Sequence, residues 1–598
     1  MAAMLVAAFC LCLSAVASGS AAEWAHGIAM HGEPALPAGY DHFPHLNPDA
    51  PQGGTLTLGQ LGSFDSLNPL IVRGNAARDI RDHVYESLLA RNPDEPFSLY
   101  GMLAEAVSMP ADRSEITFRL RPQARFSDGR PVTAADVLFS WKLLRDRGRP
   151  NTRTYYSKVA KAEAVGDREV RFVFDGSGDR EIPLIIGLMP ILPAHVTDEA
   201  TFEDTTLEPP VGSGAYQVAE VSPGRRVVFR KVADYWGAGL PFARGRNNFE
   251  RIVYDYYRDE TTLVEAFRKG LVDFLIDDDP TRWAAGYAGN RGDERIVAET
   301  VPQATPRPLS ALVLNTRRPP FDDIGVRRAL IGLFDAEWLN QTLYSGLYER
   351  TQGYFDGSAL SSIGVAMDGA EAEILGAAAN ALPPEMRDGS FRMPASDGTG
   401  RNRGGLRDAL KRLSAAGFRA DAGGSLVGAD GRALAFEIVV ATREQERLAL
   451  SYARMLKRAG ITARVRSVDA TQFEQRRQTY DYDVIPFVWT QSLSPGNEQL
   501  FYWSAEAART PGTRNYPGIE DPAVDGAIQA MLEARERDRF EAAVRALDRE
   551  LVAGFYVIPL FHIRGQWIAY WTRIARPETI PLNGLTVDML WARTAGGE

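Results

Sequence analysis

Cysteine, an excess of positive charge and long hydrophobic runs are all scarce in this 598-residue sequence. The two cysteines, Cys10 and Cys12, both lie in the first 22 residues. If those residues are cleaved off, no thiol is left for a disulfide or for a metal site. The formal net charge of −10 argues against nucleic acid and against an anionic membrane surface as partners.

The first 22 residues are typical of a secretory signal peptide. The run Leu5–Val16 is apolar but too short to span a membrane, and no longer run follows it. Small residues at 20–22 precede Glu23, although Lys and Arg are missing before the apolar run. Phe9 makes a poor lipoprotein box in front of Cys10. We therefore expect cleavage after residue 22 and a soluble, lipid-free protein in the periplasm.

Catalytic and metal-binding motifs are also missing. The sequence has no G-x-S-x-G elbow, P-loop, H-E-x-x-H helix or dinucleotide fingerprint. Four of the seven histidines lie at 26, 31, 42 and 45, but their spacing fits no structural zinc pattern. The acidic run Asp273–Asp279 lacks the alternating ligands and mid-loop glycine of a calcium loop. We expect no enzyme activity, no cofactor and no metal.

What the sequence does contain is a long globular chain of alternating strand and helix patterns. Its 45% hydrophobic and 24% charged residues are ordinary for a globular protein, and its length predicts several lobes. The clearest local pattern is a hairpin, in which strands at 216–221 and 227–232 flank Pro223–Gly224. Proline fixes the first corner of such a turn and glycine supplies a positive φ at the second.

The sequence around this hairpin resembles a known family. The hairpin is preceded by V-G-S-G-A-Y at 211–216 and followed by D-Y-W-G at 234–237, which together are similar to the signature of family 5 extracellular solute-binding proteins. Three further stretches match family motifs in the same order. They are the stretch from Ser127-Asp128-Gly129 to a helix capped by Thr133, the G-L-V-D-F strand at 270–274, and A-L-V-L-N at 311–315 before P-F-D-D-I-G-V-R-R-A. The arm at 26–54 and the Gly-, Pro- and Ser-rich region at 353–404 resemble the YejA-type branch, which serves oligopeptide and microcin C uptake.

This resemblance implies an α/β protein with the periplasmic binding protein type II fold (cluster C), in which three lobes form two halves around a ligand cleft. The implied division is a signal peptide at 1–22; lobe I at 23–70, 197–305 and 563–598; lobe II at 71–196; and lobe III at 306–562.

The stretch expected to carry specificity follows the strand Tyr482–Trp489. The polar loop 490–499 leaves this strand beside several aromatic residues, a composition that suits either a small-ligand site or a solvated surface loop. Many peptide-binding members of the family have an aspartate soon after the equivalent tryptophan, where it pairs with the amino terminus of the peptide. Here Thr490, Gln491 and Ser492 occupy those places, and the next acid is Glu498. The candidate ligand contacts are Phe64, Asn315, Trp489, Gln491, Ser492, Ser494, Asn497, Glu498 and Tyr502, and for Phe64 a place in the core is equally open.

The expected function is binding without chemistry. The resemblance implies a monomer that closes over an oligopeptide, or a peptide-like compound, by hinge bending and delivers it to the inner-membrane permease of an ABC importer. A sugar, an opine or another solute in the same cleft stays open as the ligand, and a secreted hydrolase is the alternative from a different class.

Overall fold

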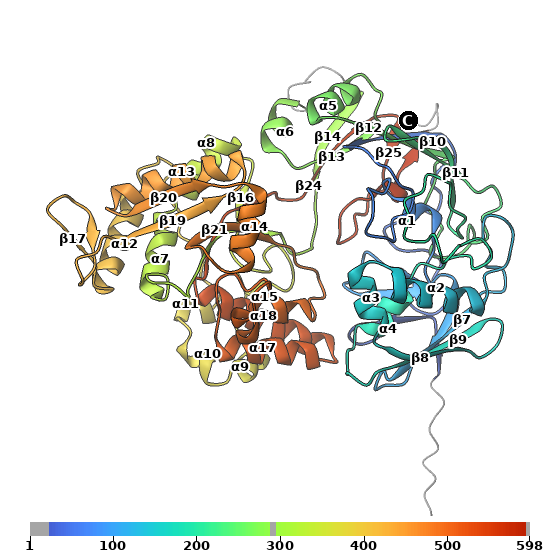
Figure 1. Cartoon of the computed structure of the whole chain (residues 1–598), viewed down its shortest axis with the longest axis horizontal. Coiled ribbons are helices and arrows are strands. Elements are labelled where there is room, and N and C mark those ends of the chain that lie inside the picture. The colour runs from blue at the N-terminus through green and yellow to red at the C-terminus, as the bar shows by residue number, and fades with distance from the viewer. Residues whose placement is uncertain (1–22, 287–294, 594–598) are drawn as a thin grey trace, which may run out of the picture.

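The computed structural model describes residues 23–286 and 295–593, so the predicted signal peptide lies outside the described residues. Three main sheets organise the chain, and helices cover them (Figure 1). In the part of the chain described here, no helix combines the length and the apolar character that crossing a membrane requires.

Lobe I is built on a seven-stranded sheet. Its order is β10-β11-β12-β3-β13-β24-β14, and β3 pairs in parallel with both β12 and β13. The predicted hairpin is confirmed as β10–β11, with Gly224 at a φ of 67° in the turn. The strands are β3 (Thr55–Leu61), β10 (Tyr216–Ser222), β11 (Arg226–Lys231), β12 (Arg251–Tyr257), β13 (Phe274–Asp277), β14 (Ile296–Val301) and β24 (Gln566–Trp571), with helices α1 (Ile80–Val84), α5 (Glu260–Arg268) and α6 (Pro280–Gly286).

Lobe II has a five-stranded sheet, β1-β6-β7-β9-β8, and a three-stranded sheet, β2-β5-β4. The first two strands, which the sequence assigns to lobe I, pair here with β6 and β5. The elements are β1 (Trp24–Ala25), β2 (Gly27–Ala29), β4 (Leu89–Arg91), β5 (Ser98–Gly101), β6 (Ala104–Ser108), β7 (Glu115–Leu120), β8 (Val159–Ala164), β9 (Glu169–Phe174), α2 (Ala134–Arg147), α3 (Pro150–Tyr156) and α4 (Ile182–Gly187).

Two local predictions in this part of the chain have different outcomes. The capping box at the start of α2 is confirmed, since the Thr133 side chain and the Asp136 side chain each accept from the other's backbone N–H. The helical spacing of apolar residues at 80, 84 and 88 predicts a helix over about 78–90, but this prediction is wrong in length, because α1 ends at Val84 and the chain continues as strand β4. Leu88 and Leu89 are fully buried there, so tertiary packing overrides the helical spacing of the apolar residues.

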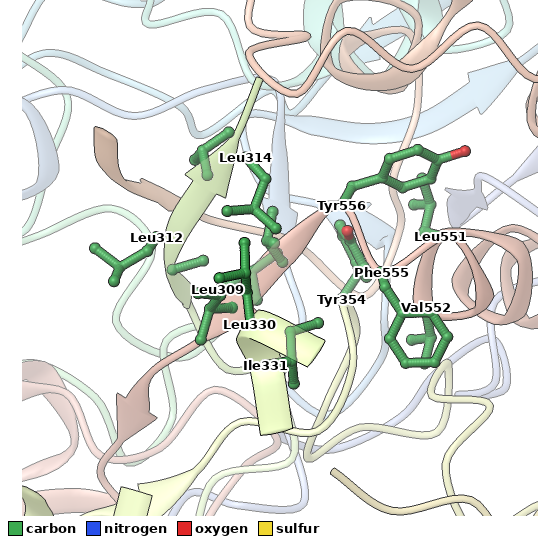
Figure 2. Packing of buried hydrophobic residues seen from close by; sticks show 14 of the residues in the cluster. Leu309, Leu312, Leu314, Leu330, Ile331, Tyr354, Leu551, Val552, Phe555 and Tyr556 are labelled. Carbon is green, nitrogen blue, oxygen red and sulfur yellow. The ribbon is translucent and has the colours of Figure 1, made fainter. Parts of the chain in front are cut away.

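Lobe III surrounds a third sheet of order β20-β19-β21-β15-β22. Figure 2 shows side chains from β15, from α7 and from the end of α18 gathered in its core. The strands are β15 (Leu309–Leu314), β19 (Ala435–Val440), β20 (Thr462–Ser467), β21 (Val484–Trp489) and β22 (Val557–Pro559). The helices are α7 (Ile324–Leu333), α8 (Ala336–Tyr344), α9 (Gly369–Leu375), α10 (Ala377–Ala381), α11 (Pro384–Arg387), α12 (Arg403–Ala415), α13 (Arg443–Arg458), α14 (Ala470–Gln478), α15 (Glu498–Trp503), α16 (Ala505–Arg509), α17 (Pro522–Glu533) and α18 (Arg537–Ala553).

Short strand pairs complete the fold. They are β16 (Glu349–Arg350) with β23 (Phe561–His562), β17 (Arg419–Ala420) with β18 (Leu426–Val427), and β25 (Ile574–Ala575) with β26 (Trp591–Ala592).

Two chain segments, 302–308 and 563–565, connect lobe III with the sheet of lobe I (Figure 1). Arg307 joins them, because its Nη2 donates to the carbonyl oxygens of Gln303 at 2.9 Å and of Arg564 at 2.6 Å. The guanidinium is 8% exposed, so these bonds are shielded from water. The two segments are therefore held side by side at the junction of the halves, and we call them the hinge.

Candidate functional site

The carboxyl ends of parallel strands from both halves mark the site. In lobe I, β3, β12 and β13 run in the same direction and end at Leu61, Tyr257 and Asp277. In lobe III, β19 and β21 are parallel and end at Val440 and Trp489. Ligands of open α/β sheets bind beyond this edge, where loops and helix starts present their polar groups.

A cavity of about 590 Å³ lies between these two edges, next to the hinge. Lobe I contributes Asp278, directly after β13, and lobe III contributes Tyr348, Glu444 and Gln491. The further lining residues are Gln303, Thr305, Pro306, Arg307, Pro308, Ser310, Tyr344, Val488, Thr490, Leu560, Phe561, His562 and Ile563. Since both halves and the hinge form its walls, a molecule in this cavity contacts both halves of the protein.

Gln491 presents a hydrogen-bond donor in this cavity. The indole N–H of Trp503 donates to Gln499 Oε1 at 2.9 Å, and Gln499 Nε2 then donates to Gln491 Oε1 at 2.7 Å. Because an indole can only donate, this chain fixes the orientation of both amides. Gln491 Nε2 is buried and, among the described residues, has no acceptor. An acceptor from a ligand would satisfy it.

Aromatic rings form the wall near the hinge. Tyr348 lies 5.0 Å from Tyr344 between ring centroids and stacks on Trp567 at 6.2 Å, with an interplanar angle of 8°. Trp567 stacks in turn on Trp283 at 5.4 Å. The Tyr348 hydroxyl donates to the Asp278 carbonyl oxygen at 3.3 Å, which joins lobe III to lobe I beside the cavity.

A second, charged compartment of about 650 Å³ adjoins the first and shares Asp278, Tyr348 and Glu444 with it. Arg443 and Arg447 reach it from the first turns of α13. The remaining lining residues are Glu260, Asp279, Pro280, Thr281, Arg282 and Tyr344. Charges of both signs therefore surround this compartment.

Four of the predicted contacts lie in the protein core. Phe64 is 3% exposed and packs on Tyr256, and Asn315 is fully buried, donating to the carbonyl oxygens of Tyr480 and Tyr482. Trp489 is also fully buried, with its ring 4.9 Å from that of Trp503. The buried residue Tyr502 accepts from Arg514. A direct ligand contact at these four positions stays a prediction. Their burial in the core does not support it.

The end of the predicted loop faces lobe II. The Asn497 backbone N–H donates to Glu181 Oε1 at 3.2 Å, and Glu498 accepts from the Gly496 N–H. Burial, followed by the nearby charge of Glu498, raises the pKa of Glu181 to about 7. Ser492 is exposed, and its hydroxyl accepts from the Ser494 N–H. Of the candidates in this loop, Gln491 is the one that lines the cavity.

Sequence reasoning missed Asp278, Tyr348 and Glu444. The acidic run Asp273–Asp279 fits no calcium loop, yet within it Asp278 immediately follows a strand. Glu444 follows β19 at the start of α13, which is the same kind of strand end that drew attention to Gln491. Applying the strand-end rule to every predicted strand would have found both acids. Tyr348 lies before the short strand β16 and carries no comparable signal.

The histidines of the N-terminal arm are dispersed. His26 bonds to the Leu36 carbonyl oxygen, His45 bonds to Asp94 at 2.7 Å, and His31 stacks on Phe540. Across the described ranges, no group of three or more His, Cys, Asp or Glu side chains is placed to hold a metal ion.

Comparisons with known proteins agree with this architecture. Residues 98–510 match the model of the bacterial extracellular solute-binding proteins, family 5, middle region. A putative binding protein of Brucella suis is 44% identical over 95% of this chain and 94% of its own. The peptidoglycan-binding protein YepA and the probable peptide-binding protein YejA, both of Agrobacterium fabrum, are 43% and 39% identical, each over 99% of this chain and over 99% and 98% of their own.

Two solved structures show the same fold at lower identity. NikA from Brucella suis, in complex with Fe(III)-EDTA, superposes with a TM-score of 0.68 at 20% identity, over 90% of this chain and 100% of that chain. The oligopeptide-binding protein AppA from Bacillus subtilis, in complex with a nonapeptide, gives a TM-score of 0.62 at 19% identity, over 91% and 100%.

Proposed function

Because the chain belongs to the bacterial extracellular solute-binding proteins of family 5, we propose that it is the periplasmic binding component of an ABC importer for peptides or peptide-like solutes. Relatives named for peptide and for peptidoglycan binding support this ligand class, which includes peptides derived from peptidoglycan as well as compounds of the microcin C type. Its partners would be this ligand and the inner-membrane permease, to which it would deliver the ligand as a monomer.

The observation that carries the proposal is the unsatisfied amide of Gln491 in a cavity shared by both halves. A peptide offers a carbonyl acceptor at every residue, so it can satisfy Gln491 Nε2 wherever its backbone passes. Tyr348 and Tyr344 line the same cavity as Gln491 and offer apolar ring surface to a ligand. A sugar hydroxyl could also accept this bond, so a sugar ligand is the second candidate.

Asp278 and Glu444 could pair with the amino terminus of a peptide in place of the aspartate that this sequence lacks after Trp489. They face the same cavity from opposite halves, and Tyr348 lies beside them. Two carboxylates that approach each other during closure repel, unless a cationic group lies between them. Arg282 lies 3.5 Å from Asp278 and already offsets part of this repulsion, and the ammonium group of a peptide would add a further cation between the two halves, which favours closure over ligand.

The test begins with ligand that purifies with the protein. We expect native mass spectrometry of the mature protein, purified from the periplasm after its leader has been removed, to show a bound peptide or peptidoglycan fragment. That ligand should raise the melting temperature without being consumed. If the protein consumed the ligand, it would be a hydrolase and not a binding protein. If the bound ligand were a carbohydrate without peptide, the proposed ligand class would be wrong.

The amine site has a sharper test. Acetylating the amino terminus of the bound peptide should weaken binding to the wild type, and Glu444→Gln should reduce that loss. Glu498→Gln is the matched control, because Glu498 bonds within its own loop and faces lobe II. If the control variant reduces the loss and Glu444→Gln does not, the amino terminus is bound at Glu498.

A further inference from the structure

A third compartment opens on lobe I beside the other two. Its volume is about 260 Å³, and it shares Glu260, Asp278 and Arg282 with the charged compartment. Its remaining walls come from Leu61 at the end of β3, from helix α5 and from β13. Asp278 lines all three compartments, so they adjoin one another at this residue.

Five of the nine residues that line this compartment are aliphatic, and two of these are exposed to water. Ile276 is 54% exposed and Leu61 is 38% exposed, while Leu275 and Val264 are buried behind them. Apolar side chains that face water in a concave site gain free energy when an apolar group covers them. The exposed aliphatics therefore favour an apolar occupant.

The charges at the rim are largely neutralised by one another. The Arg282 guanidinium bonds to Asp277 at 2.7 Å and also pairs with Glu260. These hydrogen bonds raise the pKa of Arg282, which keeps it charged and engaged. Arg282 is thus already engaged by carboxylates, and Asp278, which also lines the rim, lies 3.5 Å from its guanidinium.

The volume indicates the size of the occupant. An apolar cavity of about 150 Å³ lined by Leu, Ile and Phe binds benzene. A compartment of about 260 Å³ accommodates a larger group, such as a phenyl or indole ring with its methylene or a branched aliphatic side chain. A single methyl group would leave most of the wall uncovered.

We propose that this compartment is a specificity pocket for one large apolar side chain of the captured peptide. The inference rests on the proposed function, since the peptide backbone in the adjoining cavity is what presents that side chain. It adds a substrate class: peptides with an aromatic or branched aliphatic residue at one defined position are preferred over peptides with only small residues.

The test compares tetra-alanine with the four peptides that carry a single phenylalanine at positions one to four. Calorimetry should show one of the four binding the wild type roughly tenfold tighter than tetra-alanine, because the larger side chain buries more apolar surface. Ile276→Asp should abolish that preference, so that none of the four peptides binds it more tightly than tetra-alanine does, and a circular dichroism spectrum like that of the wild type shows that the variant is folded.

Leu271→Asp is the matched control. Leu271 is 60% exposed and lies just before β13, but it is not among the residues that line the compartment. It should retain the preference. Equal affinity of the wild type for all five peptides would overturn this inference and leave the proposed function standing. If none of the five binds and no peptide purifies with the protein, the proposed function falls and this inference falls with it.

Discussion

At the scale of single residues, one hydrogen-bond chain prepares the site. Trp503 and Gln499 are fully buried in lobe III, and neither lines the cavity. Together they fix which end of the Gln491 amide is offered to a ligand. The exposed neighbour Ser492 has the same kind of polar side chain without this support. We therefore propose that Gln491 contributes more to binding than Ser492, because buried partners hold the Gln491 side chain in place.

The first prediction separates these two neighbours. Gln491→Ala should weaken peptide binding by about 0.5–1.5 kcal/mol, the usual net value of one hydrogen bond. Ser492→Ala should leave the affinity unchanged. Isothermal titration with the co-purified ligand measures both. An equal loss in the two variants would mean that the whole loop moves onto the ligand.

The second prediction concerns Trp489. The indole is fully buried and contacts Phe487 and Trp503, so we expect Trp489→Ala to leave a cavity in lobe III. The free energy of unfolding should fall by about 3–5 kcal/mol in urea titrations. If the variant kept its stability and lost only affinity, the sequence-based interpretation of Trp489 as a ligand contact would be correct after all.

At the scale of elements, helix α18 anchors the long region at 353–404. Arg549 on α18 is 1% exposed and bonds to Glu371 of α9 at 2.8 Å, and Asp548 accepts from the Ser362 N–H and hydroxyl. Arg545 pairs with the same glutamate. A region that looks aperiodic in the sequence is therefore ordered by contacts with another element in addition to its own short helices.

The third prediction tests this anchor. Glu371→Ala leaves the buried charge of Arg549 without its carboxylate, so the free energy of unfolding should fall by about 3–5 kcal/mol. Limited proteolysis should then cut within 353–404 before it cuts elsewhere. The double variant Glu371→Met, Arg549→Met removes both charges and should recover most of the stability. If it is as unstable as the single variant, packing rather than the ion pair holds the region.

At the scale of the whole molecule, lobes II and III also touch at the side of the cleft away from the hinge, which we call the mouth. There Asn497 bonds to Glu181, His31 stacks on Phe540, and the Gly32 N–H donates to the Arg535 carbonyl oxygen at 3.2 Å. Opening the cleft must break these contacts, so they influence the balance between open and closed forms.

The fourth prediction is that this balance depends on pH. Separation of the halves would remove the charge of Glu498 and return the pKa of Glu181 towards its ordinary value near 4.5 from about 7. The contact therefore binds the proton more tightly than the separated halves do. The ionised Glu181 carboxylate destabilises the contact between the halves. This destabilisation is absent below about pH 4.5, where the carboxyl is protonated in both forms, and complete above about pH 7. Lowering the pH from 8 to 5 should favour the closed mouth.

Small-angle scattering of the ligand-free protein at the two pH values measures this effect. The radius of gyration should be smaller at pH 5, and Glu181→Gln should remove the difference. Asp179, Lys158 and Tyr155 also lie near this carboxyl, so a shift that persists in the variant would assign the effect to other groups. At pH 8, saturating ligand should shrink the wild type, and identical curves would refute hinge closure.

The sequence by itself determined the local structure and the family. The β10–β11 turn, the α2 capping box and the strand β13 depend on residues close together in the chain, so their patterns could be read directly. The family motifs lie in these same elements, which is why the fold class was predictable. Gln491 was also found, because its position at a strand end is a local feature.

The tertiary structure decided which residues face the cleft. Asp278, Tyr348 and Glu444 lie far apart in the sequence and meet only because two sheets from different halves oppose their strand ends. Trp489 was placed in the core for the same reason, since burial depends on the residues packed against it and not on its position at the end of a strand. The apolar pocket behind Ile276 likewise exists only where β3, β13 and α5 come together. Contacts across the chain create these features, and a local pattern carries no record of them.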